Sequence, residues 1–182
     1  ILNLSAPEGK SVNDGIDNKN FPATMSSTEK WLCVLNEAGH GCNIVKIDWS
    51  DAYKHIAVSP HDVCLQYFSW LGMFFAELCL IFGASSSAGI FDRTAKLIIA
   101  IVVILSEFPK HMICQHLDDT VAAAPAGDDS IYQFDKIFQQ VADRVGISLA
   151  PRDDPEKSFA PRTAGTVLGV FYDTKKWIWK IP

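Results

Sequence analysis

Residues Met112–Ala124 read MICQHLDDTVAAA, two apolar runs on either side of a pair of acids. We predict that the two runs are the strands of a hairpin and that Asp118-Asp119 is its turn, because Asp is a common turn residue. Further upstream, Ile44–Asp48 reads IVKID, which predicts another strand that also ends on an acid. The fold and the chemistry both depend on where these strand ends lie.

Helical patterns separate the predicted strands. Apolar residues recur at helical spacing over Ser86–Ser106 and again over 130–146, and Ile147–Leu149 predicts a short strand. With a hairpin at about 60–80 treated as an insertion, residues 44–149 run strand, helix, strand, strand, helix, strand. This order predicts an α+β fold of the ferredoxin-like, split βαβ type. In that topology the first strand lies beside the central hairpin, so its terminal acid meets the acids of the turn.

Two regions make up the chain around this core. Residues 1–43 predict an extended arm followed by a short capped helix over 27–39. Residues 44–182 contain the core, a loop with three prolines and a last hairpin. The strands of that last hairpin are predicted at Val167–Phe171 and Trp177–Ile181.

The composition excludes several classes of protein. The chain has 182 residues, of which 48% are hydrophobic and 20% charged, and these fractions are typical of a folded globular chain. The longest apolar run, Leu97–Leu105, is too short to span a bilayer, so we expect no membrane partner. Five cysteines without a CxxC pair indicate reduced thiols in an intracellular protein, cytoplasmic or nuclear. The net charge of -5 argues mildly against a free-standing nucleic-acid binder, but not against an enzyme that gathers acids around metal ions.

Carboxylates at adjoining strand ends repel one another, and such clusters persist where divalent cations neutralise them. Oxygen ligands without His or Cys favour Mg²⁺ or Mn²⁺. Two such ions about 3.5–4 Å apart are the standard apparatus for in-line phosphoryl transfer. The alternative interpretation is that Asp118-Asp119 is only a hairpin turn, and Asp128-Asp129 shows how easily an aspartate pair falls in a loop.

Five short segments resemble the palm motifs of reverse transcriptases, in the family's order and spacing. Asp48–Tyr53 resembles the D-x-x-x-A-[YF] motif, Leu80–Gly83 resembles L-P-x-G, and His116–Asp119 resembles the [YF]-x-D-D box. Lys157 falls where the family has a lysine after the second helix of the palm, and Val167–Phe171 resembles the F-L-G primer-grip hairpin. With the N-terminal segment described next, the resemblance covers nearly the whole chain.

The segment Leu4–Ile16, which reads LSAPEGKSVNDGI, resembles the fingers of retrotransposons that carry a tyrosine recombinase, the DIRS-like group. The resemblance implies that residues 1–43 hold partial fingers and that 44–182 form a polymerase palm with a primer-grip-like hairpin. The implied function is RNA-directed DNA polymerase, which joins a dNTP to a primer 3′-hydroxyl on an RNA or DNA template with two Mg²⁺ or Mn²⁺ ions. The implied protein partners are the rest of a retroelement polyprotein: thumb, RNase H and recombinase.

The resemblance also assigns roles to single residues. Asp48 and Asp118 would be catalytic and would hold both metal ions. The backbone carbonyl of Trp49 would be a further metal ligand, and Asp119 would be a supporting acid of the same catalytic and metal site. Tyr53 would lie under the sugar of the incoming nucleotide, where a ring leaves no room for a 2′-hydroxyl.

Further positions would bind substrate or primer. Phe82 and Gly83 would approach the nucleotide and the template, and Lys157 would lie near the pyrophosphate as a proton donor. Leu168 and Gly169 would belong to the primer grip. The alternatives remain open: a tyrosine that only fills the core at position 53, and a solvated loop lysine at position 157.

The sequence departs from the family pattern at three places. His116 stands where Tyr or Phe is usual, Ile81 stands where Pro is usual, and no basic fingers strand precedes the Leu-Ser-x-Pro segment. These departures favour the alternative of a non-catalytic reverse-transcriptase-like remnant that serves as a structural or interaction module. A third alternative is an intron-encoded or telomeric polymerase of the same palm type, and the Ser11–Gly15 segment argues against it.

Overall fold

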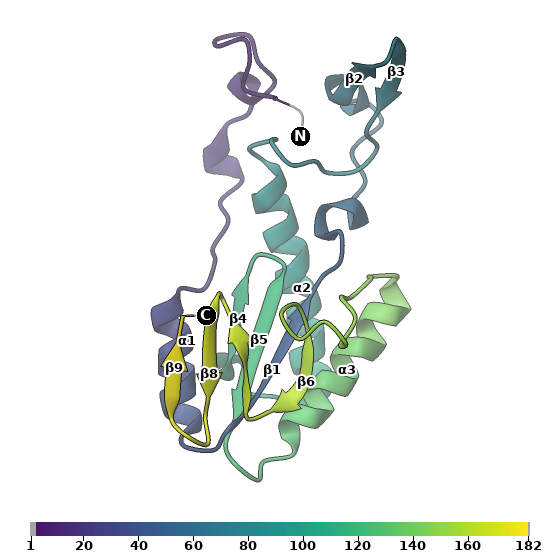
Figure 1. Cartoon of the computed structure of the whole chain (residues 1–182). Coiled ribbons are helices and arrows are strands. Elements are labelled where there is room, and N and C mark those ends of the chain that lie inside the picture. Colours follow the sequence, from purple (N-terminus) through teal and green to yellow (C-terminus); the bar gives the residue numbers. More distant parts are fainter. Residues whose placement is uncertain (1–2, 182) are drawn as a thin grey trace. The chain divides into compact units, whose positions relative to one another are not determined.

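The computed structural model describes residues 3–181, so the first two residues of the predicted arm and Pro182 lie outside the described residues. Figure 1 shows its helices and strands in chain order. They are α1 (Thr28–Ala38), β1 (Asn43–Asp48), β2 (Tyr67–Trp70), β3 (Met73–Ala76), α2 (Ser87–Ser106), β4 (Ile113–His116), β5 (Asp119–Ala124), α3 (Ser130–Val145), β6 (Phe159–Arg162), β7 (Ala164–Val167), β8 (Val170–Asp173) and β9 (Ile178–Lys180). The chain divides into two compact units. One holds the described residues up to Thr24 with Asp51–Thr94, and the other holds Met25–Ser50 with the described residues from Ala95.

The second unit is built on one antiparallel sheet. Within the described residues its strand order is β4-β5-β1-β6. The strands β1 and β5 pair along their whole length, from Asn43 opposite Ala124 to Asp48 opposite Asp119. The hairpin of β4 and β5 confirms the predicted strands, but its turn is Leu117-Asp118, and Asp119 already belongs to β5.

The two faces of β1 carry different residues, because side chains alternate along a strand. The Trp49 ring, just after β1, meets the Phe138 ring of α3 edge to face at 6.5 Å, so Trp49 with Val45 and Ile47 marks the face that α3 covers. Their cross-strand partners on β5 are small, with Ala122 opposite Val45 and Thr120 opposite Ile47. Lys46 and Asp48 therefore lie on the other face.

Helix α3 has its predicted amphipathic pattern. Ile131, Phe134 and Phe138 are fully buried, and Gly146 ends the helix in a left-handed conformation. Figure 1 shows α3 alongside the sheet of the second unit. Helix α1 begins at the predicted cap, where the Ser27 hydroxyl accepts a hydrogen bond from the Lys30 amide.

The fourth strand was predicted at the wrong place. Ile147–Leu149 contributes only an isolated bridge between Leu149 and Trp49, and the edge strand beside β1 is β6. Pro161, one of the three prolines of the predicted loop, lies in β6, and an edge strand tolerates proline because one side of the strand needs no donor.

The C-terminal region is a three-stranded meander, β7-β8-β9, in place of the single predicted hairpin. The predicted strand Val167–Phe171 is wrong, because Leu168-Gly169 forms a tight turn in its middle, with both residues at positive φ. The turn of the predicted hairpin is present between β8 and β9. Gly165 of β7 lies so close to the ring of Phe159 that an added Cβ would approach the ring atoms to 2.6 Å.

The first unit contains the arm, the inserted hairpin and the beginning of α2. The predicted hairpin is confirmed as β2 and β3, joined by Leu71-Gly72, and the Phe68 and Phe75 rings stack across it at 5.4 Å. The arm packs tightly on α2, because a Cβ at Gly89 would meet the Phe21 carbonyl oxygen at 2.1 Å. Among the helices of residues 3–181, none is long and apolar enough to cross a membrane.

Candidate active site

The ends of β1 and β5 bring two predicted acids face to face. Asp48 and Asp119 are directly opposite each other in the antiparallel register, so their side chains share one face of the sheet. Asp118 precedes β5, and its backbone carbonyl accepts a hydrogen bond from the Trp49 amide at 3.3 Å. The residues predicted as metal ligands therefore come together at one strand end.

Two hydrogen bonds of its backbone groups fix the position of Asp48. Its amide donates to the hydroxyl of the buried Ser158 at 3.0 Å, and its carbonyl accepts from the Ala150 amide at 2.8 Å. Lys157, next to Ser158, is exposed and close enough to Asp48 to act on it electrostatically. The loop between α3 and β6 thus supplies both an anchor and a cation at the acids.

The acids are electrostatically coupled. Partial burial, together with the negative charges of Asp119 and Asp118, raises the pKa of Asp48 to about 6, against the opposing effect of Lys46 and Lys157. Burial also raises the pKa of Asp119, while the nearby Lys46 opposes this shift. Such clustered carboxylates favour a bound cation, which would relieve their repulsion.

The donor chemistry at this strand end fits a hard divalent cation. Mg²⁺ is commonly bound by one or two protein carboxylates together with substrate phosphates, so Asp48 and Asp118 with a backbone carbonyl form a suitable partial set. Across residues 3–181, however, no group of three or more His, Cys, Asp and Glu side chains is arranged to hold a metal ion.

His116 lies opposite Asp119 across the hairpin. Its Nδ1 is 3.1 Å from the backbone carbonyl oxygen of Ser26. Because a carbonyl oxygen can only accept, this contact requires the proton on Nδ1, and the neutral ring then presents Nε2 as an acceptor. The segment before α1 thus orients the exposed imidazole, and no sequence pattern indicates this contact.

Other predicted substrate residues lie in the first unit and form a group of their own. The ring of Tyr53 is 4.8 Å from that of Phe82 and 5.7 Å from that of Phe91, measured between centroids. Tyr53 is buried, whereas Phe82 and Gly83 are exposed. Tyr53 and Phe82 also line a cavity of about 320 Å³, whose wall includes the ion pair of Lys54 with Glu77.

The arm holds the loop that carries Phe82 and Gly83. The side-chain amide of Asn13 donates to the Gly83 carbonyl at 2.8 Å, and its oxygen accepts from the Ser85 amide at 3.0 Å. Asn13 belongs to the segment that we compared with retrotransposon fingers, but its side-chain contacts join residues 70 and 72 positions away in sequence. Sequence patterns do not reveal such a contact.

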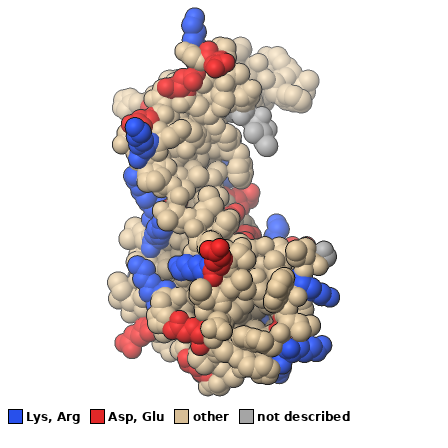
Figure 2. Space-filling model, turned by 90° about the vertical axis from the view of Figure 1, so that its left-hand side faces the viewer, with Lys and Arg blue, Asp and Glu red and all other residues tan. Residues whose placement is uncertain are grey.

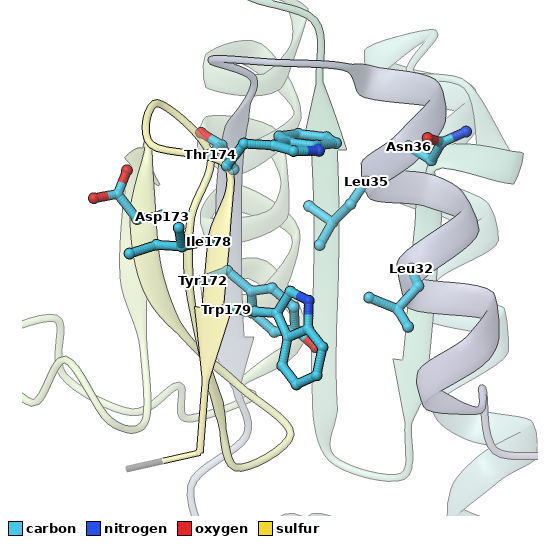
Figure 3. Close-up of a pocket in the computed structure, with 9 residues that line it drawn as sticks. Leu32, Leu35, Asn36, Tyr172, Asp173, Thr174, Ile178 and Trp179 are labelled. Carbon is cyan, nitrogen blue, oxygen red and sulfur yellow. The ribbon is translucent and has the colours of Figure 1, made fainter.

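The predicted primer-grip residues lie elsewhere in the second unit. Leu168 and Gly169 form the turn of β7 and β8. The same meander and α1 enclose a cavity of about 350 Å³, whose apolar wall includes Leu35, Tyr172 and Trp179 (Figure 3). None of the predicted site residues lines this cavity.

One charged side chain at the strand end, that of Lys46, was not predicted from the sequence. Lys46 is only 8% exposed, and its ammonium lies 3.3 Å from Asp119 Oδ1. A signal was present, because Lys46 interrupts an apolar strand two residues before Asp48 and so shares its face. On the molecular face in Figure 2, Lys and Arg are interspersed with Asp and Glu on a mainly uncharged surface.

Comparisons with solved structures show which known proteins have a similar fold. The crystal structure of the native protease-reverse transcriptase of prototype foamy virus matches with a TM-score of 0.62 and 19% identity, over 95% of this chain and 20% of that chain. A foamy viral protease-reverse transcriptase in complex with an RNA/DNA hybrid matches with a TM-score of 0.60 and 19% identity, over 82% and 18% of the two chains. Another, in complex with double-stranded DNA, matches with a TM-score of 0.59 and 19% identity, over 87% and 26%. No family model and no curated protein sequence matches the chain.

These similarities define the class of fold. The chain is a mixed α/β protein with antiparallel sheets and a reverse-transcriptase-like fold. It spans about a fifth of the length of the native foamy virus chain.

Proposed function

We propose that the chain is the catalytic palm, with part of the fingers, of an RNA-directed DNA polymerase. The observation that carries this proposal is the meeting of Asp48, Asp118 and Asp119 at one strand end of a reverse-transcriptase-like fold. The strand order β4-β5-β1-β6, with α2 and α3 as the connections, supports the ferredoxin-like interpretation of this palm.

The acids at the strand end would do the catalytic work. Asp48 and Asp118, with the Trp49 carbonyl, would hold Mg²⁺ or Mn²⁺, while Asp119 supports the site from the opposite strand. Bound divalent ions supply Lewis-acid activation of the primer hydroxyl and charge stabilisation at the leaving pyrophosphate. Lys157, exposed beside Asp48, would face the pyrophosphate and donate a proton to it.

The first unit would select the substrate. Tyr53 would stand against the sugar of a dNTP, and its contacts with Phe82 and Phe91 would hold the ring in place. The Phe82-Gly83 loop, fixed by Asn13, would lie against the nucleotide and template. Leu168 and Gly169 would contact the primer strand.

Solved structures of similar fold support a nucleic-acid partner. Foamy viral enzymes of this fold have been solved with an RNA/DNA hybrid and with double-stranded DNA. A primer–template duplex is therefore the partner we propose for this chain. Because the net charge is -5, we expect weak duplex binding at physiological salt by the chain alone. The origin in a DIRS-like retroelement rests on the Leu4–Ile16 segment.

Primer extension tests the proposed function. The full-length gene product that contains this chain is given an RNA template, a DNA primer, dNTPs and Mg²⁺. We expect extension by the wild type and a loss of roughly 10³-fold in Asp118→Asn, since removing a metal ligand forfeits several kcal/mol of transition-state stabilisation.

The matched control is Asp153→Asn, which removes one carboxylate from an exposed loop residue and should extend the primer like the wild type. A folded wild-type protein that extends no primer with either Mg²⁺ or Mn²⁺ would contradict the proposal. It would favour the non-catalytic alternative, to which His116 and Ile81 point.

A further inference from the structure

Lys46 is a buried cation in the middle of the candidate active site. It lies on β1 and is 8% exposed, between the apolar residues Val45 and Ile47. Burial of an ammonium group is costly unless the charge is paired and hydrogen-bonded. Two contacts satisfy it: Asp119 Oδ1 lies 3.3 Å from Nζ, and Nζ donates to the Glu156 carbonyl at 2.9 Å.

These contacts hold the ammonium on one side of the acids. Glu156 belongs to the loop that precedes β6, so its carbonyl fixes Lys46 from outside the hairpin. Lys46 and Asp48 are two residues apart on β1, and Asp119 is the register partner of Asp48, so all three side chains share one face. The ammonium is therefore a counter-charge placed directly against Asp119.

We propose that Lys46 is a positioning residue that engages Asp119 and keeps it out of the metal-binding set, so that Asp48 and Asp118 alone offer carboxylates to a divalent ion. This inference rests on the proposed function. A carboxylate already paired with a fixed cation is a poorer ligand, and the fixed positive charge weakens the binding of a second cation nearby. The protein alone then holds the ion weakly, and phosphate oxygens of the substrate complete the site.

Mn²⁺ binding to the 182-residue chain, measured by electron paramagnetic resonance of the free ion, tests this role without any turnover. Lys46→Met removes the charge at similar volume, and Lys46→Arg retains it. We expect the affinity for Mn²⁺ to rise roughly tenfold in Lys46→Met, because a repelling charge a few ångströms away is lost. We expect Lys46→Arg to bind within about threefold of the wild type, since its charge is unchanged.

The double variant Lys46→Met with Asp119→Asn separates this role from direct ligation by Asp119. It removes both members of the pair, so its net charge equals that of the wild type, and it avoids leaving one buried charge unpaired. We expect it to bind Mn²⁺ within about threefold of the wild type, because the two charge effects cancel. Circular dichroism and thermal melting verify that each variant is folded.

Three results would overturn the inference. In the first, Lys46→Met binds Mn²⁺ no better than the wild type. In the second, the double variant loses binding, which would make Asp119 a ligand; this result decides the matter even if Lys46→Met alone fails to fold. In the third, Mn²⁺ binding is absent from the wild type and from Lys46→Met. Primer extension by the full-length gene product tests the proposed function separately, so failure of the Lys46 role and failure of the polymerase assignment remain distinguishable.

Discussion

Asp48 and Asp119 face each other across the last register pair of β1 and β5. Facing residues of an antiparallel pair have Cα atoms about 4.5–5.5 Å apart. Like charges directly opposite each other oppose folding unless a cation or a proton compensates them. Lys46 offsets part of the negative charge of Asp119. Burial and the remaining repulsion raise the pKa of Asp48 to about 6.

The first prediction concerns the pH dependence of stability. The pKa of Asp48 is about 6 in the folded chain, above its ordinary value of 3.8, so the native state binds the proton more tightly than the unfolded state. The stabilisation from this group is fully present below pH 4 and is lost as the pH rises through 6. Without divalent ions, we expect Asp48→Asn to melt at a higher temperature than the wild type at pH 7.5, with the difference shrinking toward pH 4.

Thermal melts at several pH values, with and without Mg²⁺, check this prediction. Mg²⁺ should raise the melting temperature of the wild type at pH 7.5 and leave Asp48→Asn nearly unchanged. Asp153→Asn serves as the control for loss of a carboxylate on an exposed loop. Equal pH profiles of melting temperature for the wild type and Asp48→Asn would show that folding does not raise the pKa of Asp48.

The second prediction concerns the loop that Asn13 holds. Asn13→Ala removes the acceptor of the Ser85 amide and the donor to the Gly83 carbonyl. We expect the loop to lose about 1–2 kcal/mol of local stability, since each such hydrogen bond contributes about 0.5–1.5 kcal/mol. Hydrogen exchange at the Ser85 amide should accelerate accordingly, while the exposed-site variant Asn18→Ala leaves it unchanged. Unaltered exchange in Asn13→Ala would remove Asn13 from its positioning role.

The third prediction concerns sugar selection by Tyr53. In the full-length gene product, Tyr53→Val should increase the incorporation of ribonucleotides relative to dNTPs, because the obstacle to the 2′-hydroxyl is the ring. Tyr53→Phe keeps the ring and should retain the wild-type preference. Because Tyr53 packs on Phe82 and Phe91, we also expect Tyr53→Val to destabilise the fold by about 2–4 kcal/mol. Destabilisation without any change in nucleotide preference would assign Tyr53 to packing alone.

The fourth prediction concerns the hairpin of β2 and β3. Leu71 is 82% exposed and has a φ of 48°, a left-handed conformation that Asn adopts more readily than Leu. Leu71→Asn should stabilise the hairpin by about 1 kcal/mol, measured as slower hydrogen exchange of its amides. Leu71→Ala keeps the unfavourable φ and should give no such gain. Equal exchange in both variants would mean that the turn carries little strain.

Much of the sheet could be predicted because its signals are local. Alternation and chain order predicted β1, β4 and β5, and helical periodicity predicted α3. The edge strand β6 was missed because Pro161 is a loop signal in sequence and becomes acceptable only once the strand is known to lie at an edge. The turn at Leu168-Gly169 was missed because Leu rarely adopts a positive φ.

The candidate site also has features that the sequence predicts and features that only the folded chain shows. The positions of Asp48 and Asp118 followed from motif spacing and topology. The ion pair of Lys46 with Asp119 depends on cross-strand register, which is fixed only by the assembled sheet. The contact of Asn13 with Gly83 joins segments 70 residues apart, and no periodic pattern carries that information.

A crystal of the chain soaked with Mn²⁺ and examined by anomalous scattering would test the metal site most directly. We predict a peak within coordination distance of the Asp48 and Asp118 carboxylates, with Asp119 still paired with Lys46. An anomalous map with no Mn²⁺ at these two carboxylates, at a concentration that saturates the protein in solution, would contradict the assignment of this strand end as a polymerase metal site.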